Sequence, residues 1–203
     1  IALFLVALTS CTLTKAVYHF TANIDDYKIF KNREVKAGNY EEWDIADNYN
    51  NYEIPDKYKS EIKELETVAY LVVHKDKILF EEYRDDYDKE TISNSFSMAK
   101  SFTSLLIGLA IEDGYIESVD QKVSEIVKEY NTETNKELTI KDVLTMSSGL
   151  EWKERYASPF SHTTKAYYSK NLEKLIIKLD IIKKKKKKFK YLSGSTQLLA
   201  LIV

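Results

Sequence analysis

The stretch that decides the fold runs from Ser93 to Val127 and reads SNSFSMAKSFTSLLIGLAIEDGYIESVDQKVSEIV. Between Met98 and Ile111 it is apolar almost throughout, interrupted by one lysine and three hydroxyl residues, and Gly114 stands where a helix-ending glycine belongs. A helix that is apolar on all sides is typical of the centre of a domain. We therefore expect a buried central helix whose first turn holds Ser97.

A serine and a lysine stand three residues apart at the start of this helix, in Ser97-Met98-Ala99-Lys100. Residues at this spacing share a helix face, so the amine can lie beside the hydroxyl group. The positive end of the helix dipole stabilises negative charge that develops at the serine. Apolar surroundings penalise a charged lysine, which can then accept a proton near neutral pH. The pattern predicts Ser97 as a nucleophile and Lys100 as its base.

The same spacing occurs a second time, in Ser60-Glu61-Ile62-Lys63. This copy lies in a charged segment in which Lys63 would stay solvated and protonated, so we interpret it as a surface feature. A G-x-S-x-G motif does not occur in the sequence, so an α/β-hydrolase triad is unsupported.

A β-hairpin is predicted before the serine helix, because two β-rich runs, Thr67–His74 and Lys77–Tyr83, are separated only by Lys75-Asp76. The first run is apolar on both faces, which is typical of a strand that is covered on both sides. Further elements are expected as a short strand near Tyr27–Phe30 and as helices over Ser60–Glu66, Val119–Tyr130, Ile140–Met146 (with Thr139 as N-cap) and Leu172–Leu179. Strands followed by a long helical part indicate an α+β or two-layer α/β architecture.

Two further blocks follow the serine helix: LTIKDVLTMSSGLEW at Leu138–Trp152 and FKYLSGSTQLLALIV at Phe189–Val203, which contains Tyr191-Leu192-Ser193. The serine helix resembles the nucleophile helix of the serine β-lactamase and penicillin-binding-protein superfamily. The second block resembles that family's helix entering a Ser-Gly loop, and the third resembles the block with its Tyr-x-Asn/Ser motif. The resemblance covers roughly residues 67–203 and is closest to the class C-related esterases, D-aminopeptidases and 6-aminohexanoate-dimer hydrolases.

This resemblance implies an α+β fold of the β-lactamase/D,D-peptidase type, with an antiparallel sheet and a helical region. It implies that Tyr191 is a second catalytic base beside Lys100, and that Ser193 hydrogen-bonds the substrate or Lys100. The backbone N–H of Ser97 would form half of an oxyanion hole. No cofactor is implied.

The chain departs from the family at its C-terminal end. Neither Lys-Thr-Gly nor His-x-Gly follows Tyr191, and the chain stops at Val203 inside an expected helix. The family's Pro-Gly turn before Tyr191 is replaced by KKKKKKFK at residues 183–190. We interpret these lysines as a solvated run, the alternative being a basic patch for anionic lipid or nucleic acid. We expect the chain to be a fragment, incomplete at the C-terminus and weakly active or inactive alone.

The first eleven residues predict a lipoprotein signal. The apolar run Ile1–Leu8 suits a signal-peptide core, and Leu8-Thr9-Ser10-Cys11 resembles the bacterial lipobox. Lipid on Cys11 would anchor the protein in a bacterial cell envelope, at the membrane or facing it in the periplasm. The alternative is a buried N-terminal element with a core cysteine. We accordingly divide the chain into a signal-like segment (1–11), a polar extension (12–60) and a partial catalytic domain (61–203).

Composition excludes several other functions. The formal net charge is -2, which gives no general argument for a nucleic-acid partner. A single cysteine excludes an internal disulfide, and His19, His74 and His162 lie too far apart in the sequence to suggest a metal site with Cys11.

The sequence thus predicts hydrolysis of an ester, amide or β-lactam bond in a small-molecule or peptide-like substrate, through an acyl-enzyme on Ser97. The alternatives are a D,D-peptidase or β-lactamase acting on cell-wall peptides or antibiotics, and a non-catalytic envelope protein that binds peptidoglycan or a partner. A damaged gene product without function is a third alternative.

Overall fold

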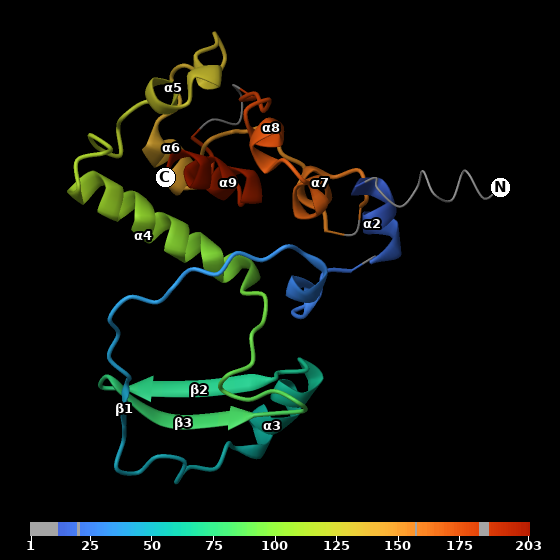
Figure 1. Cartoon of the computed structure of the whole chain (residues 1–203), viewed down its shortest axis with the longest axis vertical. Helices are drawn as coiled ribbons and strands as arrows, with labels where there is room; N and C mark the ends of the chain where they lie inside the picture. The colour runs from blue at the N-terminus through green and yellow to red at the C-terminus, as the bar shows by residue number, and fades with distance from the viewer. Residues whose placement is uncertain (1–11, 20, 157, 183–186) are drawn as a thin grey trace, which may run out of the picture. The chain divides into compact units, whose positions relative to one another are not determined.

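The computed structural model describes residues 12–19, 21–156, 158–182 and 187–203. The predicted lipidation site at Cys11 and the first four lysines of the run lie outside the described residues, so lipid anchoring stays a prediction. The chain forms two compact units. One unit spans Asp25–Asn94, and the other combines the described residues before Asp25 with Ser95–Val203 (Figure 1).

The smaller unit contains a three-stranded sheet with strand order β1-β3-β2. Strands β2 (Ala69–His74) and β3 (Lys77–Tyr83) form an antiparallel hairpin. Lys75 and Asp76 both adopt left-handed backbone conformations, with φ angles of 51° and 58°, as a tight two-residue hairpin turn requires. The predicted hairpin is therefore confirmed.

Three features of this unit differ from expectation. A 3-10 helix, η1 (Asp26–Ile29), replaces the strand expected near Tyr27, because the backbone closes into a turn in which the Lys28 amide donates to the Asp25 carbonyl. The additional strand is β1 (Asp44–Ile45), which pairs parallel with β3 and makes the sheet mixed rather than purely antiparallel. Strand β2 is largely exposed rather than covered on both sides, because nothing within the unit packs closely over its faces. Helix α3 (Asp56–Glu64) carries the second serine–lysine copy, and both its Ser60 and its Lys63 are exposed, as predicted.

The larger unit is helical. Its elements are α2 (Thr12–Tyr18), η2 (Phe96–Met98), α4 (Ala99–Glu112), α5 (Val123–Ile126), η3 (Lys128–Tyr130), α6 (Ile140–Leu144), α7 (His162–Tyr168), α8 (Leu172–Ile176) and α9 (Ser193–Ile202). Thr139 caps α6 with a complete capping box, and Gly114 has a φ of 77° after α4, so both predicted helix boundaries are confirmed. The helix expected over Val119–Tyr130 is broken into the short α5 and η3.

The core of this unit lies between α5, α6, α8 and α9. Val123, Leu138, Ile140, Val143 and Leu198 are fully buried there. Helix α9 contacts α4, α6, α7 and α8, so it is the element around which the unit is assembled.

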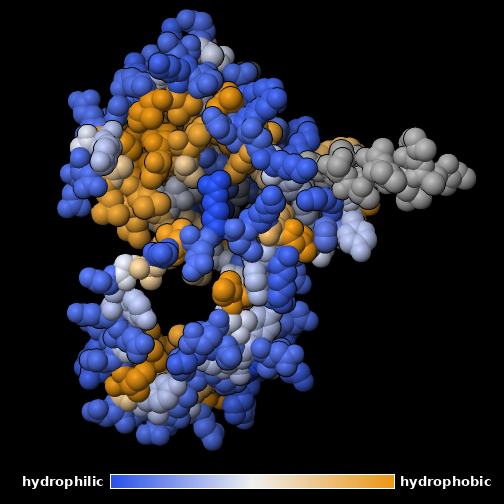
Figure 2. All heavy atoms as spheres, in the orientation of Figure 1, coloured by the Kyte–Doolittle hydropathy of each residue, from blue (hydrophilic) through white to orange (hydrophobic). Residues whose placement is uncertain are grey.

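The expectation that the serine helix is buried on all sides is wrong. In α4 only Ile107 is buried, and large apolar side chains such as Phe102, Leu105 and Leu109 are more than half exposed. Helix α4 packs against α9 along one side, which leaves its other faces at the surface. Figure 2 shows apolar side chains gathered on the surface of this unit. Within the described part of the chain, no helix has the length and apolar character needed to cross a membrane.

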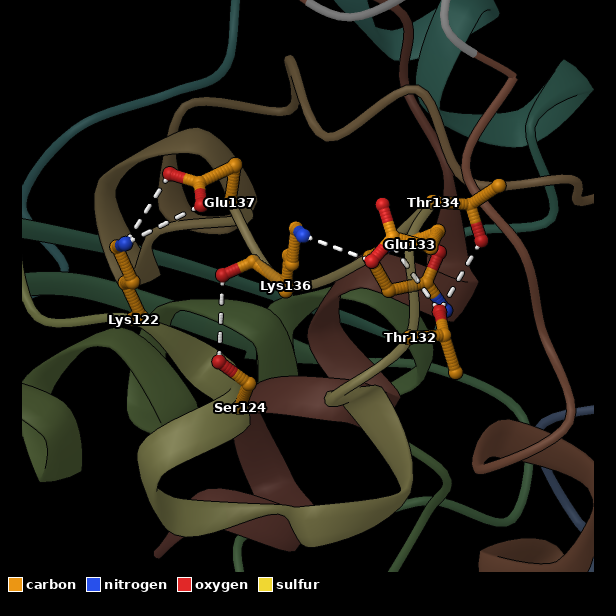
Figure 3. A network of polar contacts seen from close by, with 8 residues as sticks. Lys122, Ser124, Thr132, Glu133, Thr134, Lys136 and Glu137 are labelled. Carbon is orange, nitrogen blue, oxygen red and sulfur yellow. Dashed lines mark hydrogen bonds and ion pairs between the residues drawn. The ribbon is translucent and has the colours of Figure 1, made fainter.

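Polar contacts hold the loop between η3 and α6 (Figure 3). Exposed ion pairs join Lys122 to Glu137 and Lys136 to Glu133, and such pairs contribute little to stability. Asn135 differs, because it is only 2% exposed. Its side-chain amide donates to the Leu179 carbonyl and accepts from the Ile181 amide, each at 3.0 Å. Asn135 therefore ties this loop to the chain after α8.

Replacing Asn135 with alanine should lower the free energy of unfolding by about 2 kcal/mol, because two buried backbone groups lose their partner. Denaturant unfolding followed by circular dichroism measures the change. The exposed Asn131 provides the matched control, and Asn131→Ala should change stability by less than about 0.5 kcal/mol. Equal effects of the two substitutions would contradict the assignment.

Candidate active site

The structure brings Ser97 and Lys100 together. The Lys100 Nζ donates a hydrogen bond of 3.1 Å to the Ser97 Oγ. Ser97 lies in η2 and Lys100 in the first turn of α4, so the two side chains come from consecutive turns of one helical segment. Ser97 is exposed and Lys100 is half-buried. The hydroxyl is thus open to a substrate, while the lysine residue as a whole is partly covered.

The backbone immediately before the serine is in an unusual conformation. Phe96 has a φ of 43°, in the left-handed region that bulky residues rarely occupy. Such conformations cost about 1–3 kcal/mol and are found most often at functional sites. The conformation sets the direction in which η2 presents Ser97.

Tyr191 also lies close to the lysine amine. The Lys100 Nζ is 5.3 Å from the centroid of the Tyr191 ring, within the range of a cation–π contact. The contact is with the ring rather than with the hydroxyl group. Tyr191 is 42% exposed, and the preceding residue is fixed by a 2.7 Å hydrogen bond from the Lys190 amide to the Met146 carbonyl.

These three side chains line one open cavity of about 300 Å³. Its other lining residues are Ser101, Ser104, Leu144, Met146, Thr196 and Leu199. The walls therefore come from α4, the end of α6 and α9, which correspond to the three sequence blocks. A small substrate can reach the serine, the lysine and the tyrosine from this cavity.

Ser193 hydrogen-bonds Glu154, a residue that the sequence analysis missed. The Ser193 amide donates to one carboxylate oxygen of Glu154 at 2.6 Å, and its hydroxyl donates to the other at 2.9 Å. The expected bond from Ser193 to Lys100 is not among the contacts of the described residues, and substrate binding by Ser193 stays a prediction. The Glu154 carboxylate lies at the positive end of α9, where it stabilises the helix that follows Tyr191. No spacing pattern could link residues 39 positions apart.

Tyr156 extends the polar contacts of Glu154. Partial burial, and then hydrogen bonding to the Glu154 carboxylate, raise the pKa of the Tyr156 phenol. The Tyr156 phenol thus lies beside the Glu154 carboxylate.

The second and third blocks pack directly against each other. A Cβ atom at Gly194 would lie 2.5 Å from the Trp152 ring, so only glycine fits at this position of α9. The hydroxyl groups of Ser148 and Ser195 are 3.0 Å apart and fully buried. These contacts fix the start of α9, and with it Tyr191, relative to the Ser-Gly loop.

His162 covers the other side of Trp152. The two rings stack with centroids 5.4 Å apart, and the His162 Nδ1 accepts a 3.0 Å hydrogen bond from the Lys153 amide. Partial burial, together with the nearby Lys165, lowers the pKa of His162 below its ordinary value of 6.5. This environment therefore favours the neutral form of the His162 ring.

Comparisons with known proteins agree with this architecture. The family model described as Beta-lactamase matches residues 56–203. A Bacillus anthracis protein assigned as a 6-aminohexanoate-dimer hydrolase superposes with a TM-score of 0.58 at 21% identity, over 71% of this chain and 41% of its own. FmtA from Staphylococcus aureus gives a TM-score of 0.47 at 21% identity, over 89% of this chain and 49% of its own. A comparison with curated proteins found no match.

The Bacillus likeness shows an α+β fold of the β-lactamase type, as the sequence predicted. The family model covers well over half of the chain, and the chain therefore belongs to the beta-lactamase family. It spans less than half the length of either solved structure.

The fluorescence of Trp152 should titrate with His162. In a Trp43→Phe background Trp152 is the one remaining tryptophan, and protonation of the stacked His162 should change its emission with a midpoint below pH 6.5. Because the folded state favours neutral His162, its contribution to stability is complete above the unfolded pKa and is lost as pH falls through the folded pKa. His162→Gln should abolish the transition. A midpoint at or above 6.5 would be inconsistent with this environment.

Proposed function

We propose that this chain carries the nucleophilic part of a serine hydrolase site. Ser97 Oγ attacks the carbonyl carbon of an ester or amide, and the neutral Lys100 amine takes the hydroxyl proton. The proton then passes to the departing alcohol or amine, which leaves an acyl group on Ser97. Water hydrolyses this acyl-enzyme to release the acid and restore the serine. The observation that carries the proposal is the 3.1 Å contact between Lys100 and Ser97.

Tyr191 is proposed to assist this proton transfer. The centroid of its ring lies 5.3 Å from the Lys100 Nζ, the atom that carries the proton after Ser97 attacks. The Ser97 amide is proposed to stabilise the oxyanion, with a contribution from the positive end of the helical segment that begins at η2.

The surroundings of Lys100 favour this proposal over a purely binding role. A lysine that served a structural ion pair would contact a carboxylate, but within the described residues no acid lies within ion-pair distance of Lys100. Its hydrogen-bond partner is instead the predicted nucleophile. The proposed substrates include esters, amides and β-lactams, and cell-wall peptides remain the alternative within the same chemistry.

A fluorophosphonate probe should phosphonylate wild-type protein, and Ser97→Ala should abolish this labelling. Ser60→Ala is the matched control, because Ser60 heads the other serine–lysine copy, on the exposed α3, and its loss should leave labelling unchanged. Gel fluorescence with mass spectrometry of the labelled peptide measures both. Persistent labelling of the Ser97→Ala variant would eliminate Ser97 as the nucleophile.

Two substitutions distinguish the role of the Tyr191 hydroxyl group from the role of its ring. If the hydroxyl group transfers protons, Tyr191→Phe should reduce the labelling rate by about 100-fold, and Tyr191→Ala should reduce it at least as much. If only the ring matters, Tyr191→Phe will react at the wild-type rate. That second result would remove Tyr191 from the list of catalytic bases.

A further inference from the structure

A second cavity, of about 380 Å³, lies in the helical unit, and its walls are mostly aromatic. They are formed by Phe96, by Tyr156 and by the consecutive Tyr167 and Tyr168 at the end of α7. The remaining lining residues are small, being alanine and threonines, and among the described lining residues there is no charged side chain. The proposed reaction makes no use of this cavity.

One wall of the aromatic cavity belongs to the nucleophile segment. Phe96 directly precedes Ser97, and its ring stacks on Tyr167 with centroids 6.5 Å apart and planes 21° apart. Ser97, the next residue, lines the other cavity. The side chains of Phe96 and Ser97 thus line two different cavities, and the backbone of Phe96 is left-handed at this point.

Another wall residue of the aromatic cavity, Tyr156, is linked to the third sequence block, Phe189–Val203. Tyr156 lines the aromatic cavity, and its phenol lies beside Glu154, whose carboxylate accepts a hydrogen bond from the Ser193 amide. Ser193 is two residues from Tyr191, which lines the cavity of the serine. Two separate chain segments therefore link residues of the aromatic cavity to residues of the candidate active site, most directly at the consecutive Phe96 and Ser97.

We infer that the aromatic cavity binds an uncharged aryl or branched-alkyl substituent on the acyl group of the substrate. This inference rests on the proposed function, because it places the acyl group on Ser97. The volume accommodates a phenyl-sized group, and aromatic walls favour offset or edge-to-face contacts with another ring. A carboxylate or ammonium group would lose hydration there without gaining an oppositely charged partner among the described lining residues, so charged acyl groups are disfavoured.

Two phosphonofluoridate probes, which carry a methyl or a benzyl group on phosphorus, test this specificity. The benzyl probe should label Ser97 about tenfold faster than the methyl probe, since small differences in apolar contact change such rates by at least that factor. Tyr167→Ala should remove most of this preference and change the methyl rate less than about twofold. Tyr115→Ala is the control, because Tyr115 is exposed and lies outside the cavity. Equal rates for the two probes in wild-type protein would overturn the inference.

A binding experiment without chemistry keeps this inference separate from the proposed function. Ser97→Ala protein should bind 4-fluorophenylacetamide saturably in ¹⁹F NMR. A bulky Ala22→Trp substitution, which fills the cavity from its small side, should weaken this binding at least about tenfold. If the amide binds to Ser97→Ala protein but neither phosphonofluoridate labels wild-type protein, the aromatic binding site is supported and the proposed reaction is refuted. Absence of saturable binding, or binding unaffected by Ala22→Trp, would refute the aromatic site even if the methyl probe labels Ser97.

Discussion

The account depends on the contact between one amine and one hydroxyl group. The Lys100 amine hydrogen-bonds the Ser97 hydroxyl and also lies 5.3 Å from the centroid of the Tyr191 ring. The contact with Ser97 needs only the local geometry of η2 and α4. The contact with Tyr191 requires tertiary structure, because the two residues are 91 positions apart in the sequence.

Two rigid attachments supply that tertiary structure. The Ser-Gly loop holds the backbone before Tyr191 through the bond from Lys190 to Met146. Helix α9 holds the backbone after it, with its start packed against Trp152 and bound by Glu154. Because its backbone is held on both sides, Tyr191 would keep its orientation at little entropic cost in the proposed reaction. The three blocks thus act as one structural unit, although each is a short segment.

Local patterns in the sequence predicted the features that local forces determine. The hairpin follows from two β-rich runs and a two-residue turn, the start of α6 from the capping threonine Thr139, and the approach of Lys100 to Ser97 from helical spacing. The serine–lysine copy at Ser60 was distinguished by its charged setting alone, and its exposure in α3 agrees.

Features that depend on distant parts of the chain could not be predicted. Glu154 meets Ser193 only because the loop after Trp152 folds over the start of α9. The burial of α4 was wrongly predicted, because apolar composition indicates which faces could be covered and not which neighbours the structure provides. The aromatic cavity likewise combines Phe96 with residues of α7, a helix that the sequence analysis did not anticipate.

The contact between Lys100 and Ser97 is tested most directly by the rate at which a methyl phosphonofluoridate labels Ser97. This rate is compared between Lys100→Met protein and Lys63→Met protein. Methionine keeps much of the length and apolar volume of the lysine side chain and removes only its amine. The account predicts a loss of at least about 100-fold for Lys100→Met, which corresponds to removal of a general base, and no loss for Lys63→Met. Labelling of Lys100→Met protein at the wild-type rate would show that Ser97 does not depend on this amine.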